Sequence, residues 1–307
     1  MDIEEQKRRR SELRYVLHLL RRNPLVLLGS ALAIGSVLLA LVSPLLVPAN
    51  AWKISNFEIQ NCWNNSLFNW HIANIATCPA GKVYPLGTDF YGRDLWSMIV
   101  VSLPTDLTIA FEIVGAAFII GVTLGAVAAY AGGIIDEGVL RVTDIFFAFP
   151  VLSFAIVLAT VVERTFFWLT VAVLVIWWPT YVRLSRSQIL GEKEKPYVEA
   201  LRAMGAGRIR IIFRHLIPNS IYPVLVQATL DVGGVILTFA GLMFLGFSPL
   251  PQIPELGNLV NIGISKSSFV TAPWVVIFPG LAILLIALGF NLLGDGIRDI
   301  LDPRLRR

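Results

Sequence analysis

The chain has 307 residues, of which 56% are hydrophobic and only 15% charged, and its mean hydropathy is +0.71. Soluble domains contain about 25% charged residues, and one core could not remove this much apolar surface from water, so these values exclude an ordinary soluble protein. The net charge of +4 does not indicate nucleic acid as a partner, because the basic residues border apolar runs, as they do at the anionic cytoplasmic face of a membrane.

The N-terminal part is predicted to lie on the membrane and then to cross it. Residues 1–23 form a basic lead-in on the inner membrane surface. The run Leu25–Val47 has no charged residue and can span, because a transmembrane helix needs about 20 apolar residues. It is too long for the apolar region of a cleaved signal, and no small-residue cleavage site is obvious. We therefore interpret residues 24–47 as an N-terminal transmembrane helix.

Residues 48–103 are expected to form an extracytoplasmic segment. This segment contains both cysteines of the chain, Cys62 and Cys78. In an oxidising exterior the two thiols could pair, closing a loop of about 15 residues and contributing roughly 3 kcal/mol of stability. Two free thiols are the alternative, and the sequence leaves both open.

Five further apolar runs are predicted to span the membrane in a domain over residues 104–295. Tight helix packing is expected around Gly121 and Gly125, because small residues at this spacing let backbones approach. With the N-terminal helix, these runs predict an all-α, polytopic membrane protein with six transmembrane helices. The five runs are Leu107–Ala131, Ile145–Val162, Phe166–Val182, Asn219–Phe247 and Pro273–Leu293.

The orientation follows from the basic residues. If the N-terminus is cytoplasmic, 20 of the 25 lysines and arginines fall in cytoplasmic segments. This bias is the one that sets orientation in membrane proteins. We therefore expect both termini in the cytoplasm, with residues 296–307 as a cytoplasmic tail.

The cytoplasmic loop over residues 191–218 is predicted to contain a short helix outside the bilayer. Pro196 suits the first position of a helix, and Gly205 suits its C-terminal end, where a left-handed residue is favoured. A second short helix, Arg208–Leu216, should lead back to the membrane and stop at Pro218. Helical spacing places four apolar residues on one face of the first helix, so this face should pack against another part of the protein or a partner. These residues are Tyr197, Val198, Leu201 and Met204.

This loop resembles the EAA loop of ABC-importer permeases, written E-A-A-x3-G-x9-I-x-L-P. Glu199, Ala200, Gly205 and Pro218 match the pattern, whereas the residues at 201, 215 and 217 depart from it. The resemblance implies a coupling helix that seats in a groove of a partner ATPase. The residues to which it assigns this role are Tyr197, Glu199, Ala200, Leu201, Met204, Gly205 and Pro218.

The resemblance extends over nearly the whole chain and is closest to the C-type permease of the dipeptide/oligopeptide importers, a binding-protein-dependent transport inner-membrane component. That permease has an extra N-terminal span, as this chain does. Two departures, Ser102–Pro104 and Phe239, leave the transported substrate open between peptides and oligosaccharides. The matching segments are Leu86–Asp94, Tyr130–Gly133, Thr271–Trp274, Asn291–Arg298 and Leu301–Arg304.

The resemblance also implies a type I importer transmembrane domain in the cell membrane that forms half of a translocation path. The implied partners are a homologous permease subunit, two ATP-binding subunits and an extracytoplasmic substrate-binding protein, all in a lipid membrane. ATP and magnesium would be bound by the ATPase subunits. This chain itself has no G-x-x-x-x-G-K-[ST] loop to hold phosphates, so no cofactor and no catalytic residue are expected in it.

Two acidic residues fall within predicted spans. A charge at the membrane centre costs about 2.5–3.5 kcal/mol on insertion scales, so Glu112 and Asp231 should face protein or a wet cavity. Both are candidates for lining the path, with Phe239 as a third. For Glu112, about one turn from the outer end of its predicted span, reaching the interface is the alternative. For Asp231 the alternative is a hydrogen bond between helices.

Other charged residues have structural interpretations. Arg141 and Asp144, three positions apart, are expected to form an ion pair on one helix. The external residues Asp89, Arg93 and Asp94 either order the outer loop or meet a binding protein, and the first is favoured. The three histidines are scattered, so no metal site is predicted.

Two other classes of function compete with a permease. An intramembrane enzyme would need a nucleophile with its base or a set of metal ligands, and neither is evident. A stand-alone, ion-coupled secondary transporter using Glu112 and Asp231 is the stronger alternative. It would leave the cytoplasmic helix from Pro196 to Gly205 without a role.

Overall fold

The computed structural model describes residues 23–47, 85–89, 92–249, 254–266 and 272–301, and this part of the chain is helical apart from short connections and one isolated bridge between Thr88 and Asp94. Cys62, Cys78, the basic lead-in and the end of the tail lie outside these residues. Within them, five helices are long and apolar enough to cross a membrane, and a bent pair of shorter helices makes six if it counts as one span. The all-α membrane fold is confirmed. The five helices are α2 (Pro24–Leu46), α4 (Leu95–Ala131), α7 (Phe166–Lys193), α11 (Tyr222–Leu242) and α13 (Trp274–Leu301).

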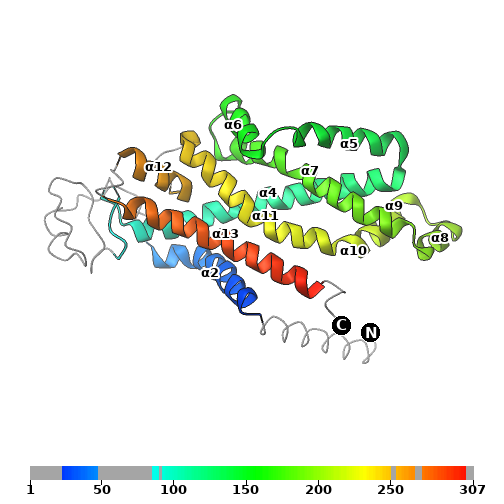
Figure 1. Cartoon of the computed structure of the whole chain (residues 1–307), viewed down its shortest axis with the longest axis horizontal. Coiled ribbons are helices and arrows are strands. Elements are labelled where there is room, and N and C mark those ends of the chain that lie inside the picture. Colours follow the sequence, from blue (N-terminus) through cyan, green and yellow to red (C-terminus); the bar gives the residue numbers. More distant parts are fainter. Residues whose placement is uncertain (1–22, 48–84, 90–91, 250–253, 267–271, 302–307) are drawn as a thin grey trace.

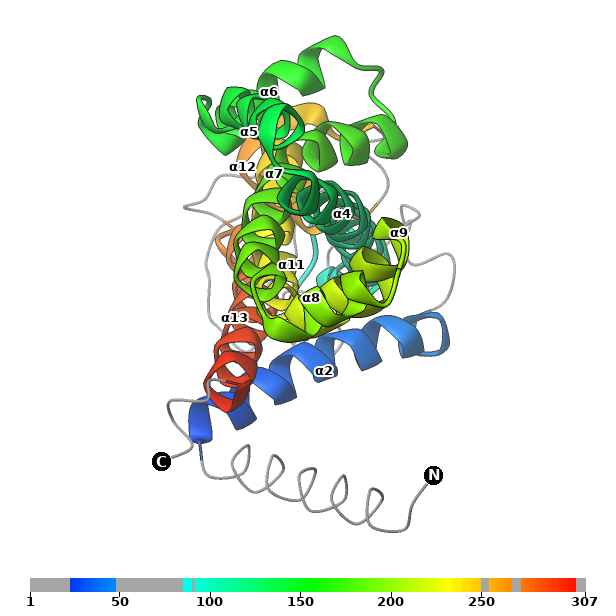
Figure 2. The same cartoon turned by 90° about the vertical axis from the view of Figure 1, so that its right-hand side faces the viewer.

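The long helices run side by side, with different short helices at the two ends of the bundle (Figure 1). At one end lies α12 (Leu256–Lys266), which packs against α13 and α11. At the other end lies α8 (Pro196–Ala203). Viewed from the α8 end, α2 and α13 lie on one side of the bundle, and the bent pair lies on the opposite side (Figure 2).

The N-terminal helix α2 matches its predicted span to within one residue. Asn23 caps it, because the Asn23 side chain accepts a hydrogen bond from the Leu25 backbone N–H at 3.1 Å. Helices α2 and α13 approach each other closely at Gly289 of α13. A Cβ at this position would lie only 2.8 Å from the Ala33 backbone nitrogen of α2. The rest of α2 is largely exposed and apolar, as expected for a helix against lipid.

Helix α4 contains the whole predicted span Leu107–Ala131, ends at the predicted residue and begins twelve residues before the span, at Leu95. Asp94 caps the helix by accepting a hydrogen bond from the Ser97 N–H at 3.0 Å. The first three turns contain polar residues that hydropathy does not favour. Ser102 is buried and donates to the Met98 carbonyl of the preceding turn at 2.8 Å, so a bond within the helix satisfies its hydroxyl.

The predicted close packing at Gly121 and Gly125 is confirmed. Both glycines face α7, and a Cβ on Gly121 would lie 2.3 Å from the Tyr181 Cβ. A Cβ on Gly125 would lie 2.1 Å from the Ser185 hydroxyl oxygen. Helices α4 and α7 are therefore in backbone contact over this stretch.

The predicted third span, Ile145–Val162, is not one helix. It is divided between α5 (Gly133–Phe147) and α6 (Val151–Val161), whose axes are bent by 88°. The break falls at Pro150, which disfavours a helical conformation for the residue before it and cannot continue the hydrogen-bond ladder. The 11 residues of α6 rise only about 16 Å, which is half of the hydrocarbon core of a bilayer.

The last three long helices extend beyond or differ from their predicted runs. Helix α7 continues eleven residues past Val182, because its arginines are paired with acidic residues of α5. Helix α11 continues into a π-helical turn, η2 (Met243–Phe247), with Gly246 at φ +90°. Helix α13 reaches Leu301, beyond the predicted end of its apolar run.

Candidate functional site

The short helix predicted outside the bilayer is present as α8, with Pro196 at its start. Two backbone hydrogen bonds close its C-terminal end. The Ala206 N–H donates to the Leu201 carbonyl at 3.0 Å, and the Gly205 N–H donates to the Arg202 carbonyl at 2.9 Å. Gly205 adopts φ +77° between them. This arrangement is the Schellman motif, which satisfies the last carbonyls of a helix and favours glycine at this position. The predicted helix and its cap are both confirmed.

The apolar face of α8 is covered by the same chain. Val198 is fully buried, and Tyr197 and Leu201 pack partly buried around it. The cover consists of residues from α4, α7, α9 (Arg208–Ile211) and the π-helical turn η1 (Ile212–Leu216). These covering residues are Ala126, Ala129, Ile189, Ile211, Ile212 and Leu216.

Met204 does not belong to this face, so its predicted place there was wrong. The helix ends at Ala203, and Met204 is the cap residue with ψ 3°. Its side chain therefore leaves the helical face and is 75% exposed. Glu199, Ala200 and Gly205 are exposed as well, so the matching residues Glu199 and Ala200 lie on the outer side of α8, and Gly205 lies just after its end.

Pro218 does not end the second short helix, contrary to prediction. The chain stays helical through η1 and α10 (Ile217–Ser220) before α11 begins. Proline has no N–H for the helical ladder, and a π-helical turn directly before it is the kind of local widening that accommodates such a break. The loop is therefore continuous with α11 instead of being separated from it.

Side-chain hydrogen bonds fix α8 to its neighbours. The Tyr197 hydroxyl donates to the Glu192 carboxylate at 3.0 Å, and the Asn219 amide donates to the Tyr197 oxygen at 3.4 Å. Lys195 pairs with the same carboxylate at 2.5 Å. Tyr197 thus joins α8 to the end of α7 and to α10.

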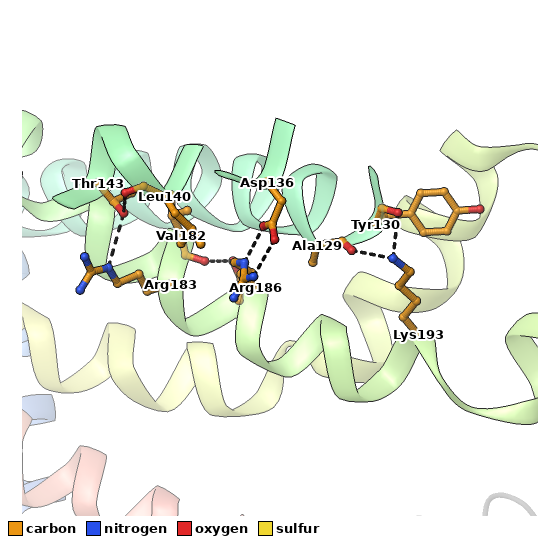
Figure 3. A network of polar contacts seen from close by, with 10 residues as sticks. Ala129, Tyr130, Asp136, Leu140, Thr143, Val182, Arg183, Arg186 and Lys193 are labelled. Atoms are coloured by element: carbon orange, nitrogen blue, oxygen red, sulfur yellow. Dashed lines mark hydrogen bonds and ion pairs between the residues drawn. The ribbon is translucent and has the colours of Figure 1, made fainter. Parts of the chain in front are cut away.

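Two ion pairs join α5 to α7, and Figure 3 shows the one between Arg186 and Asp136. Arg186 donates to both carboxylate oxygens of Asp136, at 2.5 and 2.6 Å. Arg183 pairs with Asp144 and lies over the Phe147 ring, 4.1 Å from its centroid. The predicted pair between Arg141 and Asp144 is therefore wrong: Arg141 pairs with Glu137 at 3.3 Å. Asp136 and Asp144 of α5 therefore pair with arginines of α7, whereas Glu137 pairs within α5.

The three candidate path residues lie in different surroundings. Asp231 is buried in α11, where its carboxylate accepts a hydrogen bond from Gln227 at 2.9 Å and faces Tyr181 of α7. Phe239 is buried in the core of the subunit. Glu112 alone of the three is exposed. The structure therefore does not bring these residues together at one site.

Glu112 lies deeper in its helix than the sequence suggested. It is 17 residues from the start of α4, a distance of about 25 Å, instead of one turn from the outer end. Its neighbour Phe111 makes an edge contact with Phe290 of α13, with ring centroids 5.9 Å apart. This distance is the one to the start of the helix, and reaching the interface stays the alternative interpretation of Glu112.

The end of the bundle at α12 contains two buried acidic residues that sequence reasoning missed. Asp106 accepts a hydrogen bond from the Leu256 N–H at 3.2 Å, and Glu255 accepts from the N–H groups of Gly257 at 3.0 Å and Asn258 at 2.7 Å. Burial raises the pKa of the Glu255 carboxyl to about 8. Glu255 precedes a short amphipathic helix, as an N-terminal cap does, and that was the one local signal.

The segment before α4, predicted to be external, is ordered by its own side chains. Arg93 donates to the Asp89 carboxylate at 2.6 Å, and both residues are buried. The Trp274 ring N–H donates to the Thr88 carbonyl at 3.1 Å and so connects this segment to α13. The favoured interpretation, that these residues order the outer loop, fits this geometry.

With this geometry established, comparison with known proteins identifies the family. Residues 121–307 match the family described as binding-protein-dependent transport system inner membrane components. The chain belongs to this family. The matched region begins within α4 and includes α8 with its cap, and the family description agrees with the apolar helices of the fold.

Curated relatives in this family are permeases. The chain is 34% identical over 287 residues to the dipeptide transport system permease protein DppC of Alkalihalophilus pseudofirmus, covering 94% of this chain and 88% of that protein. It is 38% identical over 224 residues to DppC of Haemophilus influenzae, covering 73% and 75%. It is 40% identical over 221 residues to the glutathione transport system permease protein GsiD of Pectobacterium atrosepticum, covering 72% and 73%.

The fold has a counterpart among solved structures. A chain of the MetNI methionine ABC transporter in an inward-facing conformation superposes with a TM-score of 0.54 at 20% identity, covering 68% of this chain and 98% of that chain. At this identity the likeness concerns the fold alone. It agrees with the type I importer fold that the family resemblance implied.

Proposed function

We propose that this permease forms half of the translocation path of an ATP-driven peptide importer and is coupled to partner ATPases through α8. The observation that most supports this proposal is the way in which α8 packs. One face of α8 is buried against α4 and α7, while Glu199 and Ala200 are exposed. A capped helix held in this way can receive a movement from a partner and pass it to the spans. The names of the relatives favour peptides as the substrate class, and oligosaccharides are the second candidate.

The proposed assembly has a homologous permease, two ATP-binding subunits and an extracytoplasmic substrate-binding protein. The ATPases would bind ATP and magnesium and would hold α8 in a groove. Closure of the ATPases would then press on α8 and change which side of the membrane the path opens to. This chain contributes the moving helices and no catalytic group.

The orientation proposed from the basic residues puts the α8 end in the cytoplasm. The start of α2 and the end of α13 lie toward that end of the bundle (Figure 1). This arrangement is what two cytoplasmic termini require. Protease accessibility of terminal tags in sealed inside-out vesicles would test it.

Glu112 is the proposed polar residue of the path. It lies in the middle third of α4 and is exposed on the single subunit. Because a charge in hydrocarbon is costly, a wet path or the second permease should cover it. A carboxylate there suits the ammonium group that a peptide presents.

Co-purification with the cognate ATPases tests the proposed coupling. We expect the double substitution Glu199→Ala with Gly205→Val to abolish ATPase binding. Gly207→Ala is the matched control, because Gly207 has φ −67° and a Cβ there would meet nothing within 4 Å. Retained ATPase binding with full ATP-dependent uptake in the double variant would count against the proposal.

A stand-alone, ion-coupled transporter remains the second candidate. It would use Glu112 and Asp231, but one is exposed and the other is buried against α7. Uptake by the chain alone in vesicles with an imposed proton or sodium gradient would favour this candidate. Uptake only with ATPases and ATP would eliminate it.

A further inference from the structure

Helix α8 is joined to the transmembrane helices in two ways. The first is covalent: α7 ends at Lys193 and α8 begins at Pro196, so only Glu194 and Lys195 separate them. The second is a set of contacts at the inner end of α4. These contacts come from Lys193 and from Arg202 of α8 and meet at one residue, Tyr130.

Lys193 holds the last turn of α4 (Figure 3). Its ammonium donates to the carbonyl oxygens of Ala129 at 2.9 Å and of Tyr130 at 3.1 Å. The last four carbonyls of a helix have no partner within that helix, and a cation is favoured beside them by the helix dipole. The end of α7 is thereby fastened to the end of α4.

The Tyr130 ring is approached by two cations. The Arg202 guanidinium carbon lies 5.3 Å from the ring centroid, and the Lys193 ammonium nitrogen lies 5.8 Å from it. A cation over an aromatic face within about 6 Å is attracted to the ring. The ring also packs, partly buried, against the cluster that contains Val198. Tyr130 therefore links α4 to the side of α8.

The backbone turns sharply after the last residue of α4. Gly132 and Gly133 have φ values of +67° and +56°, which turn the chain between α4 and α5. The ion pairs Arg186–Asp136 and Arg183–Asp144 fasten α5 to α7 instead. A displacement applied at Tyr130 thus acts on α4, the helix in which Glu112 lies.

We propose that Tyr130 is the transmission residue between α8 and α4: its ring, contacted by Arg202 and Lys193, passes the movement of the coupling helix to the helix that contains Glu112. The covalent link moves α7, which contacts α4 at Gly121 and Gly125, and Tyr130 couples the last turn of α4 directly to α8. Tyr130 is a positioning residue and touches no substrate. This inference rests on the proposed function, since it presupposes that ATPases move α8.

The test is hydrogen–deuterium exchange on the complete complex, without nucleotide and trapped with ATP and vanadate. In the unchanged protein we expect nucleotide to alter exchange at the inner ends of both α4 and α7. In Tyr130→Leu, the nucleotide-dependent change in exchange at the inner end of α4 should become at least about fivefold smaller, which is the low end of coupling between two sites. The change at α7 and the ATPase rate should stay as in the unchanged protein. Tyr130→Phe, which keeps the ring, should retain the response. Arg141→Gln, in an exposed ion pair on α5, is the unaffected control.

The outcomes separate this inference from the proposed function. An undiminished α4 response in Tyr130→Leu, or an equal loss in Tyr130→Phe, would overturn the role of the ring. If Tyr130→Leu does not assemble, Arg202→Gln is measured in its place, with Arg202→Lys as its conservative partner. If neither Tyr130→Leu nor Arg202→Gln assembles, Tyr130 serves docking and the transmission role is overturned. Failure of the unchanged chain to bind ATPases would reject the proposed function itself.

Discussion

The carboxyl groups of Asp106 and Glu255 are neighbours buried at the α12 end of the bundle, with 6% and 1% of the two residues exposed. They come from α4 and from the start of α12, and both accept hydrogen bonds from the first N–H groups of α12. Two neighbouring carboxylates cannot both be charged without large cost when water is excluded. The contact between α4 and α12 is therefore stable only when one of the two carboxyl groups is protonated.

This dependence predicts how stability changes with pH. Burial raises the pKa of Glu255 to about 8, above its ordinary value, so its protonated form favours the folded state. The contribution is fully present below the ordinary pKa and is lost as pH rises through about 8, by a few kcal/mol. We expect the melting temperature of the purified subunit to fall between pH 6 and pH 9.

Glu255→Gln is the control for that prediction. The amide cannot ionise, so the additional fall between pH 6 and pH 9 should disappear, although loss of one accepted N–H bond lowers stability at every pH. The difference between the two curves isolates Glu255 from other titrating groups. A variant whose curve parallels that of the unchanged protein would contradict the prediction.

Gly121 should tolerate no side chain. A Cβ there would lie 2.3 Å from the Tyr181 Cβ and 2.8 Å from the Trp178 carbonyl oxygen, so α4 and α7 would have to separate. We expect Gly121→Val to cost about 3 kcal/mol or more and to lower the yield of monodisperse protein. Gly35→Ala on α2, where nothing lies within 4 Å, should behave as the unchanged protein. Equal melting temperatures for both variants would show that the helices are not in close contact.

The pair between Asp136 and Arg186 should stabilise the position of α5. Both side chains are largely buried and make two hydrogen bonds, so Asp136→Asn should cost about 1.5–3 kcal/mol. Arg141→Gln should cost about 0–1 kcal/mol, because that ion pair is exposed. Thermal unfolding of the two variants in detergent compares them directly. A larger loss in Arg141→Gln would reverse the assignment of partners described above.

Substitution of Glu112 distinguishes the path from lipid. If the carboxylate lines the path, Glu112→Gln should reduce ATP-dependent uptake about tenfold, a change of roughly 1.4 kcal/mol in binding, at unchanged complex yield. If it faced hydrocarbon, removal of the charge would raise stability by up to about 2.5–3.5 kcal/mol and leave uptake unchanged. Measuring uptake and melting temperature on the same preparation separates the two results.

The sequence by itself was sufficient where the determining pattern is local. The charge-free run of α2 located that helix to within one residue, because solvation by lipid requires only an unbroken apolar stretch. Pro196 and Gly205 located α8 for a similar reason: both act through the backbone of the helix that they begin or end. The spacing of Gly121 and Gly125 likewise predicted a close contact between helices. It did not predict that the partner is α7.

Only the tertiary structure decided what depends on a partner distant in the chain. The first turns of α4 are polar, and Asp106 is accommodated there because Leu256, 150 residues later, donates to it. Met204 does not lie on the apolar face because α8 ends at Ala203, one residue before it. Asp144 pairs with Arg183 of α7 instead of the nearby Arg141. Apolar periodicity and caps act within one or two turns, whereas the partner of a charged group depends on which helices pack together.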